Sequence, residues 1–302
     1  MKFEKPFLFL SALIASFVIA SGVTTVSKPS NYSESYPVVV CPPTLNGLTS
    51  QISISSRKTQ YQRLENRSSK TVPFKALRFP VTKDSLVISA EGTTPLIWQS
   101  RAGSWAGGTL CSGPNSAAWF VGGTANVTSR GRLILINSGL SDSIVDVQSY
   151  TENAKQPIKS VNLKSKSYVQ LSLDSLAPGD KALAVQVTPR SGRVNAFMID
   201  EQGKGLRALG GDLVNPIIAP SKTLVIPAIP NQKKKLGQSA GTTHVLRVLT
   251  PGDVDASVTV ELVSGDGVFI PVGLNSRSVS AGQVTELTFS PSISSTVFAV
   301  KI

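Results

Sequence analysis

The feature that most constrains the fold is a series of short β-branched segments, each broken by Gly, Pro, Asn, Asp or Ser. Helical periodicity is not evident after residue 28. Within several segments apolar and polar residues alternate, so that Val258, Val260 and Leu262 would share one face of a strand. Such alternation leaves one face buried and one wet, which is typical of antiparallel sandwiches. We therefore expect an all-β protein.

An internal repeat predicts how these strands are grouped. The segment Leu133–Asn153 aligns with Leu246–Asp266, with glycines and valines at matching positions. This repeat predicts two tandem immunoglobulin-like β-sandwich units. We expect the first at residues 38–205, including an N-terminal extension that contains the cysteines, and the second at 222–302. The Gly- and Pro-rich stretch 206–221 lacks alternation and is expected to be the linker.

The N-terminus predicts export. A basic start at Met1–Lys5 precedes the uncharged, mostly apolar run Pro6–Val23, the pattern of a secretory signal. The run is close to the roughly 20 residues that span a bilayer, so a retained anchor helix is the alternative. We expect residues 1–26 to be a signal peptide or membrane anchor and 27–37 a polar tether. The body would then be secreted or held at the extracellular face of the cytoplasmic membrane.

The two cysteines, Cys41 and Cys111, fit this compartment, because an even pair in an exported chain predicts a disulfide. A metal-binding or reactive cysteine is disfavoured, since the chain has no C-x-x-C motif and no His near either residue. The single His in the chain also removes most His-ligated metal sites. We expect no metal and no cofactor.

Catalytic constellations are scarce in the sequence. The lone imidazole, His244, begins an expected strand, and no G-x-S-x-G motif accompanies it. Carboxylates gather in the second unit, but Asp266-Gly267 is typical of a hairpin turn. The other acidic residues there are Asp253, Asp255 and Glu261. We expect the protein not to be an enzyme.

All three tryptophans lie close to Cys111 in the sequence. We expect Trp119 to be a core residue packed against the disulfide. Trp98 and Trp105, with Arg101 between them, are the better candidates for a surface that stacks on sugar rings. These residues are proposed ligand-binding positions.

The net charge of +12 is unevenly distributed. Between Arg57 and Lys83 lie eight basic residues, Arg57 and Lys58 among them, against one acid. A second cluster is Lys233, Lys234 and Lys235. Outside the cell such charge would meet anionic lipids, wall polymers or acidic polysaccharide. The alternative is a set of solvated faces that keep the chain soluble. No nucleic-acid-binding motif is present, so no nucleic acid partner is expected.

Several segments together resemble a known family. They are CPP at Cys41–Pro43, CSGPNSAAWFVGGT at Cys111–Thr124, SGRVNAFMID at Ser191–Asp200 and SGDGVFIPVGL at Ser264–Leu274. Over residues 38–302 the chain resembles a family of exported actinobacterial proteins known only as a domain of unknown function. The resemblance implies secretion or surface anchoring and an association with envelope polysaccharide assembly. It supplies no catalytic residues.

The sequence thus predicts a non-enzymatic, exported or membrane-anchored protein that binds or scaffolds anionic envelope polymers or envelope membrane proteins. The alternatives are an envelope glycan-modifying enzyme that uses scattered carboxylates and an accessory subunit of a membrane glycosyltransferase.

Overall fold

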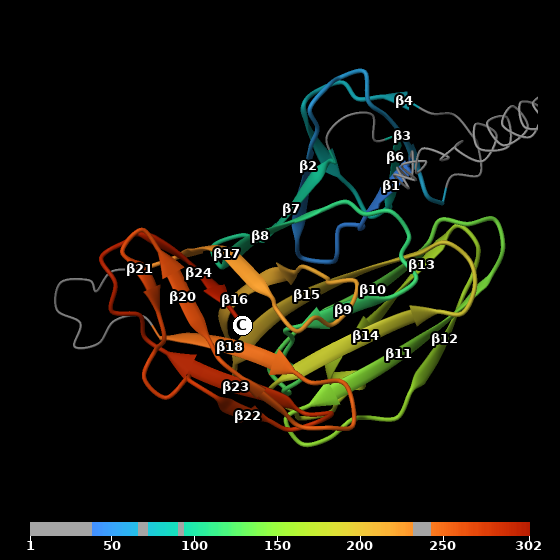
Figure 1. Cartoon of the computed structure of the whole chain (residues 1–302). Coiled ribbons are helices and arrows are strands. Elements are labelled where there is room, and N and C mark those ends of the chain that lie inside the picture. The colour runs from blue at the N-terminus through green and yellow to red at the C-terminus, as the bar shows by residue number, and fades with distance from the viewer. Residues whose placement is uncertain (1–37, 66–71, 90–93, 232–242) are drawn as a thin grey trace, which may run out of the picture. The chain divides into compact units, whose positions relative to one another are not determined.

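The structure is a computed structural model that describes residues 38–65, 72–89, 94–231 and 243–302 (Figure 1). Within these ranges the chain forms 24 strands and one short 3-10 helix, which confirms the prediction of an all-β protein. None of the helices in the described part is long and apolar enough to cross a membrane. The expected signal or anchor, the tether and Lys233–Lys235 lie outside the described residues.

The first strands form a sandwich of their own, here called the N-terminal sandwich. One sheet has the order β1-β6-β3-β4 and the other β5-β2-β7-β8. Their bounds are β1 (Val38–Cys41), β2 (Thr49–Ser53), β3 (Gln60–Arg63), β4 (Val72–Pro73), β5 (Arg78–Val81), β6 (Leu86–Ser89), β7 (Leu96–Arg101) and β8 (Trp105–Leu110). Ile88 of the first sheet packs with Ile52 and Ile97 of the second in one buried cluster. The segment expected as an extension is therefore a packed two-sheet unit.

The middle sandwich contains the longest strands. Its sheets have the orders β13-β10-β15-β16 and β12-β11-β14-β9. The elements are β9 (Ala118–Val121), β10 (Arg132–Asn137), β11 (Ser143–Thr151), β12 (Lys159–Leu163), β13 (Ser167–Ser172), η1 (Leu173–Ser175), β14 (Leu183–Pro189), β15 (Val194–Lys204) and β16 (Arg207–Val214). Leu133 and Met198 of one sheet share a buried cluster with Phe120 and Val185 of the other.

The C-terminal sandwich is built from a four-stranded sheet, β17-β24-β20-β21, and the pairs β18-β23 and β19-β22. The strands are β17 (Val225–Pro230), β18 (His244–Leu249), β19 (Ala256–Val258), β20 (Glu261–Ser264), β21 (Gly267–Phe269), β22 (Arg277–Val279), β23 (Val284–Phe289) and β24 (Val297–Lys301). Leu246 and Leu287 pack against Leu262, Phe298 and Val300 in its core.

The middle and C-terminal sandwiches share an order of strand pairing. In the middle sandwich β10 pairs with β13, and β14 pairs with both β11 and β9. In the C-terminal sandwich β18 pairs with β23, and β24 pairs with both β20 and β17. The aligned segments of the sequence therefore occupy corresponding strands.

Strand β10 shows why its sequence, RLILIN, lacks alternation. Leu133 and Leu135 point into the core of the middle sandwich. Ile134 and Ile136 point the other way and pack with Val87 of the N-terminal sandwich. A strand buried on both faces needs apolar residues at every position, so the period of two disappears.

The expected linker at 206–221 begins with a strand rather than a loop. Residues Arg207–Val214 form β16, which pairs with β15 through a register shift at Gln202/Gly203. The sequence does not predict this strand, because Gly210 and Gly211 interrupt its alternation. Gly211 has a packing role, since a Cβ there would lie 2.7 Å from the indole of Trp105.

Candidate functional site

The best candidate site is an exposed face of the β5-β2-β7-β8 sheet, centred on Trp98. Strand β7 alternates, so that Ile97 and Gln99 are fully buried while Trp98 is 48% exposed. Trp98 lies opposite Gln51 of β2 and Gly108 of β8. The buried neighbours fix the strand, and the indole stands on its outer side.

Gly108 makes room for this indole. A Cβ at Gly108 would lie 3.0 Å from the six-membered ring of Trp98, closer than ordinary van der Waals contact. Because Gly108 has no side chain, the Trp98 ring can pack directly against the backbone of β8. The ring is thereby supported from one side and open to solvent on the other.

The strand registers place further side chains on the same outer face, here called the Trp98 face. Cross-strand partners and residues two positions apart share a face of a sheet. Besides Gly108, the neighbours of Trp98 by this rule are Thr49, Gln51, Ser53, Arg78, Pro80, Leu96, Ser100, Ala106 and Leu110. The Oγ1 of Thr49 and the Oγ of Ser100 are 2.8 Å apart and hydrogen-bonded. The face thus combines an aromatic centre with amide, hydroxyl and guanidinium groups.

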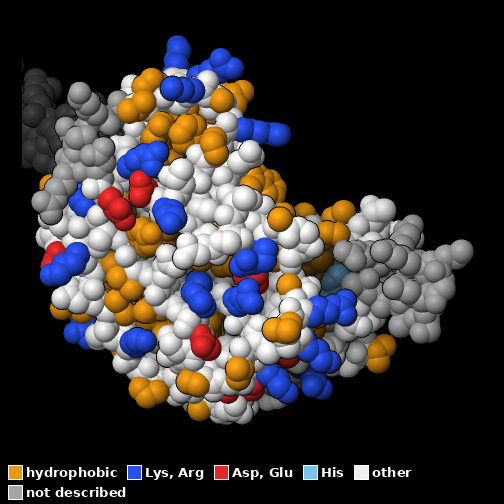
Figure 2. Space-filling model, turned by 180° about the vertical axis from the view of Figure 1, so that it is seen from behind, with side chains coloured by type: hydrophobic (Ala, Val, Ile, Leu, Met, Phe, Trp, Pro, Cys, Tyr) orange, Lys and Arg blue, Asp and Glu red, His pale blue; other side chains and the backbone are white. Residues whose placement is uncertain are grey.

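Basic side chains gather on the same sandwich. Arg57 and Lys58 are exposed in the connection from β2 to β3, and Arg78 is exposed on β5. Figure 2 shows Lys and Arg side chains clustered at the upper end of the view, which Figure 1 assigns to the N-terminal sandwich. Arg63 is partly neutralised, since its Nη1 lies 2.8 Å from Oδ2 of Asp84. The N-terminal sandwich therefore carries exposed positive charge, and Arg78 places part of it on the Trp98 face itself.

Arg101, expected to bind a ligand, has an internal partner. Its guanidinium donates to both carboxylate oxygens of Glu201, with Nη2 2.9 Å from Oε2, and to the carbonyl oxygen of Gly47. The Glu201 side chain is only 6% exposed. Burial raises the pKa of this carboxyl, but the hydrogen bonds and charge of Arg101 outweigh it, so the pKa lies below its usual value. The pair joins β7 to β15.

The expectation of a surface position for Trp105 is wrong. Trp105 is 8% exposed and packs with Ile134, Phe197 and Leu213 of the middle sandwich. Its indole fits there because Gly211 leaves the space free. Trp98 alone of the two candidates presents a ring to solvent.

Trp119 is buried as expected, but not against the disulfide. Its ring stacks on Tyr150 with the ring centroids 5.9 Å apart, in a cluster that includes Val284 of the C-terminal sandwich. The cysteines belong to a different cluster, the core of the N-terminal sandwich. Trp119 therefore stabilises the contact between the middle and C-terminal sandwiches.

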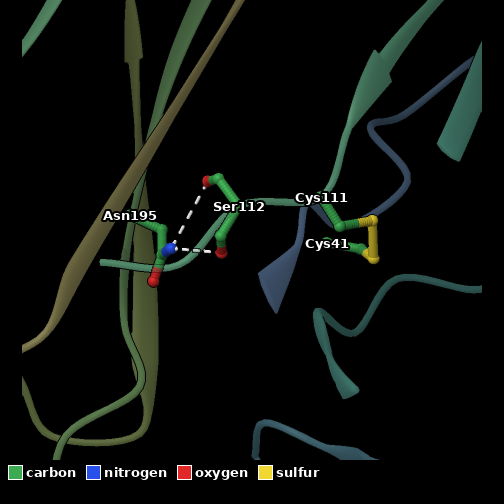
Figure 3. Close-up of a disulfide and its surroundings, with 4 residues drawn as sticks. All are labelled: Cys41, Cys111, Ser112 and Asn195. Atoms are coloured by element: carbon green, nitrogen blue, oxygen red, sulfur yellow. Dashed lines mark hydrogen bonds between the residues drawn. A yellow bond between two sulfur atoms is a disulfide. The ribbon is translucent and has the colours of Figure 1, made fainter. Parts of the chain in front are cut away.

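The predicted disulfide between Cys41 and Cys111 is confirmed (Figure 3). Their Cα atoms are 4.6 Å apart, and both residues are buried. The next residue, Ser112, accepts a hydrogen bond of 2.7 Å from Nδ2 of Asn195 to its carbonyl oxygen (Figure 3). The disulfide therefore cross-links the N-terminal sandwich at Cys111, and the next residue is hydrogen-bonded to β15.

His244, Asp266, Glu261 and Asp255, the candidate titratable groups of the C-terminal sandwich, contact other groups of the fold. His244 packs against Phe289 and Phe298, and burial lowers its pKa. Asp266 lies in the turn between β20 and β21 and accepts hydrogen bonds from Ser294 and Ser295, which lower its pKa to about 2. Among the other acids, Glu261 pairs with Lys301 at 2.8 Å and Asp255 accepts from the backbone of Ala281. Across the described ranges, no three His, Cys, Asp or Glu side chains are placed to hold a metal ion.

Sequence reasoning found Trp98 but missed the residues around it. Gln51, Arg78 and Gly108 join Trp98 only through strand pairing. The alternation of TSQIS in β2, with Ser50 and Ile52 buried, was a usable signal for the outer position of Gln51. The sequence around β2 does not indicate that β5 and β7 are its neighbouring strands.

Together these features define an all-β protein of packed sandwiches, closed near its start by a disulfide and bearing an exposed aromatic face. The chain belongs to the family of unknown function DUF5719, whose sequence profile matches residues 88–291. This match confirms the resemblance to a family of unknown function, while the actinobacterial origin stays a prediction.

Other comparisons add little. No curated protein matches the chain. A solved structure, "Crystal Structure of Thermotoga maritima 1070", is 14% identical and has a TM-score of 0.32. It aligns with 35% of this chain and 96% of its own.

Proposed function

We propose that this protein is a non-enzymatic, exported cell-envelope protein that binds anionic envelope polysaccharide through the Trp98 face. The observation that carries the proposal is the half-exposed indole on an open strand surface, packed against the backbone of Gly108. Indole rings offer a large apolar surface that stacks well on the C–H face of a sugar ring. A ring that is already held in place loses little conformational entropy on binding.

The neighbours of Trp98 supply the polar half of such a site. The amide of Gln51 can donate to and accept from sugar hydroxyls, and the Ser100 hydroxyl can do the same. Arg78 can pair with a carboxylate or phosphate on the polymer. Because these groups lie along strands rather than in a deep pocket, the face fits a chain-like ligand.

The charge distribution supports an anionic partner. Arg57 and Lys58 add positive charge to the same sandwich, and the whole chain carries a net charge of +12. Exposed charges attract a polyanion over about 10 Å at 0.1 M ionic strength and much less at high salt. Binding should therefore weaken as salt is added.

Export is supported by the buried disulfide, a cross-link that persists in oxidising compartments. The signal or anchor at residues 1–26 and the tether at 27–37 complete this part of the proposal. The shared strand order of the middle and C-terminal sandwiches supports two related, immunoglobulin-like units. In this proposal they position the N-terminal sandwich near envelope polymers or membrane proteins.

Affinity electrophoresis in gels that contain purified anionic wall polysaccharide tests the proposal. Trp98→Ala should weaken retardation about 10-fold, the effect of losing roughly 1.4 kcal/mol of stacking. Val254→Ala, which changes a residue 77% exposed in the C-terminal sandwich, is the matched control and should bind like the wild type. Equal retardation of wild type and Trp98→Ala would contradict the proposal.

A further inference from the structure

A second, smaller site lies beside the hairpin that joins β15 to β16. It is a pocket of about 60 Å³ whose charged lining residues are Arg101, Arg130, Arg207 and Glu201. The remaining walls come from Thr128 and from hairpin residues between Gln202 and Ala208. We call it the arginine pocket.

The charges in the arginine pocket do not balance. Arg101 is paired with Glu201. Arg130 and Arg207 are exposed, and neither has an acidic group within 4.0 Å in the described part of the chain. The charge of Arg130 nevertheless reaches the pocket, because it helps to lower the pKa of Glu201. Three guanidinium groups and one carboxylate leave an excess of two positive charges.

The donors available to a ligand are those of the arginines. The Thr128 hydroxyl lies 2.6 Å from the carbonyl oxygen of Gly203 and donates to it. Both carboxylate oxygens of Glu201 accept hydrogen bonds from Arg101, and the charge of Arg101 offsets the repulsion that Glu201 would exert on a second anion. By contrast, the structure shows no side-chain hydrogen bond from Arg130 or Arg207 to another described residue.

We propose that the arginine pocket binds one small oxyanion group, a carboxylate or a phosphate, between Arg130 and Arg207. The planar guanidinium fork matches the spacing of two oxygens in either group, and the paired charges strengthen the hydrogen bonds. The pocket is small, and guanidinium groups supply most of its charge, so it suits a single oxyanion group. The bound anion would offset the excess positive charge.

This inference is independent of the proposed function, because no residue of the arginine pocket belongs to the Trp98 face. The anion could be a free ion or a substituent of a larger molecule. In both cases the recognised chemistry is the same.

Isothermal titration of the full chain with inorganic phosphate and, separately, with acetate tests the site at constant ionic strength, with chloride as the reference anion. We expect saturable binding of one anion per chain for at least one probe. Arg130→Ala and Arg207→Ala should each weaken it about 10-fold, the effect of losing a charge-assisted hydrogen bond. Arg193→Ala, at another exposed arginine, should change nothing.

Two further variants keep the result interpretable. Arg130→Lys combined with Arg207→Lys retains the charge but loses the fork, and should bind with intermediate affinity. Trp98→Ala should bind the anion like the wild type, which separates this site from the polysaccharide face. Heats no larger than those of chloride for both probes, or unchanged affinity in an Arg130→Ala/Arg207→Ala variant, would overturn the proposal.

Discussion

Opening the Cys41–Cys111 bridge should destabilise the chain strongly. The two cysteines are 70 residues apart, so the bridge closes a large loop in the unfolded chain. In the chain-entropy relation, a loop of this length corresponds to about 4 kcal/mol of stabilisation at 25 °C. Both cysteines are buried in the core of the N-terminal sandwich, and reduction removes no heavy atom from that core. The expected loss is therefore mainly the entropy of the open loop.

Urea unfolding measures this loss. Oxidised protein, protein reduced with dithiothreitol, and Cys41→Ala/Cys111→Ala should be compared by intrinsic fluorescence, for which buried Trp105 is a suitable reporter. The reduced protein should lose about 4 kcal/mol of unfolding free energy, and the double variant slightly more because its core also loses two sulfur atoms. A difference below about 1 kcal/mol between oxidised and reduced protein would refute this reasoning.

Three further predictions concern the ionic groups. Glu201→Gln leaves Arg101 without its carboxylate and should lower the unfolding free energy by about 2 kcal/mol, measured in urea, whereas Lys164→Ala at an exposed pair should change it little. Burial lowers the pKa of His244 in the folded state, so its contribution to stability is present above pH 6.5 and is lost as the pH falls through the folded pKa. His244→Phe should flatten the dependence of the melting temperature on pH between about 7 and 5, and an unchanged slope would count against this. The pKa of Asp266 is about 2 in the fold against 3.8 for the free group, so its contribution is present above pH 3.8 and is lost as the pH falls towards 2. Asp266→Asn should melt at a lower temperature than the wild type at pH 6 and at a similar temperature near pH 2.

Strands were predictable from the sequence where one face of their sheet is exposed to solvent and the other is buried. Alternation at Val258–Leu262 depends only on neighbouring residues, and it correctly marks Val260 and Leu262 as buried. The structure nevertheless divides this segment between β19 and β20, which belong to different sheets. The sequence does not predict strand β16, because Gly210 and Gly211 interrupt its alternation, and Gly211 is needed for a contact with Trp105, which is remote in the sequence. For the N-terminal sandwich the sequence predicts only an extension, because its pairings, such as β1 with β6, join distant segments.

The candidate site was also predictable only in part, because its side chains come together through pairing of strands that are distant in the sequence. Composition and position marked Trp98 and Trp105 equally, and only the packing of Trp105 against the middle sandwich separates them. Glu201, the partner of Arg101, is 100 residues away in the chain, so no local sequence pattern predicts this ion pair. Side chains that act together across strands become visible only when the register is known.

The central claim, that Trp98 is the binding surface, is tested most directly by the indole N–H signals in a ¹H–¹⁵N NMR titration. The chain has three tryptophans, and Trp98→Phe assigns the signal of interest. Titration with purified anionic wall polysaccharide should shift the Trp98 signal and leave those of buried Trp105 and Trp119 in place. An unchanged Trp98 signal at saturating polysaccharide would contradict the claim.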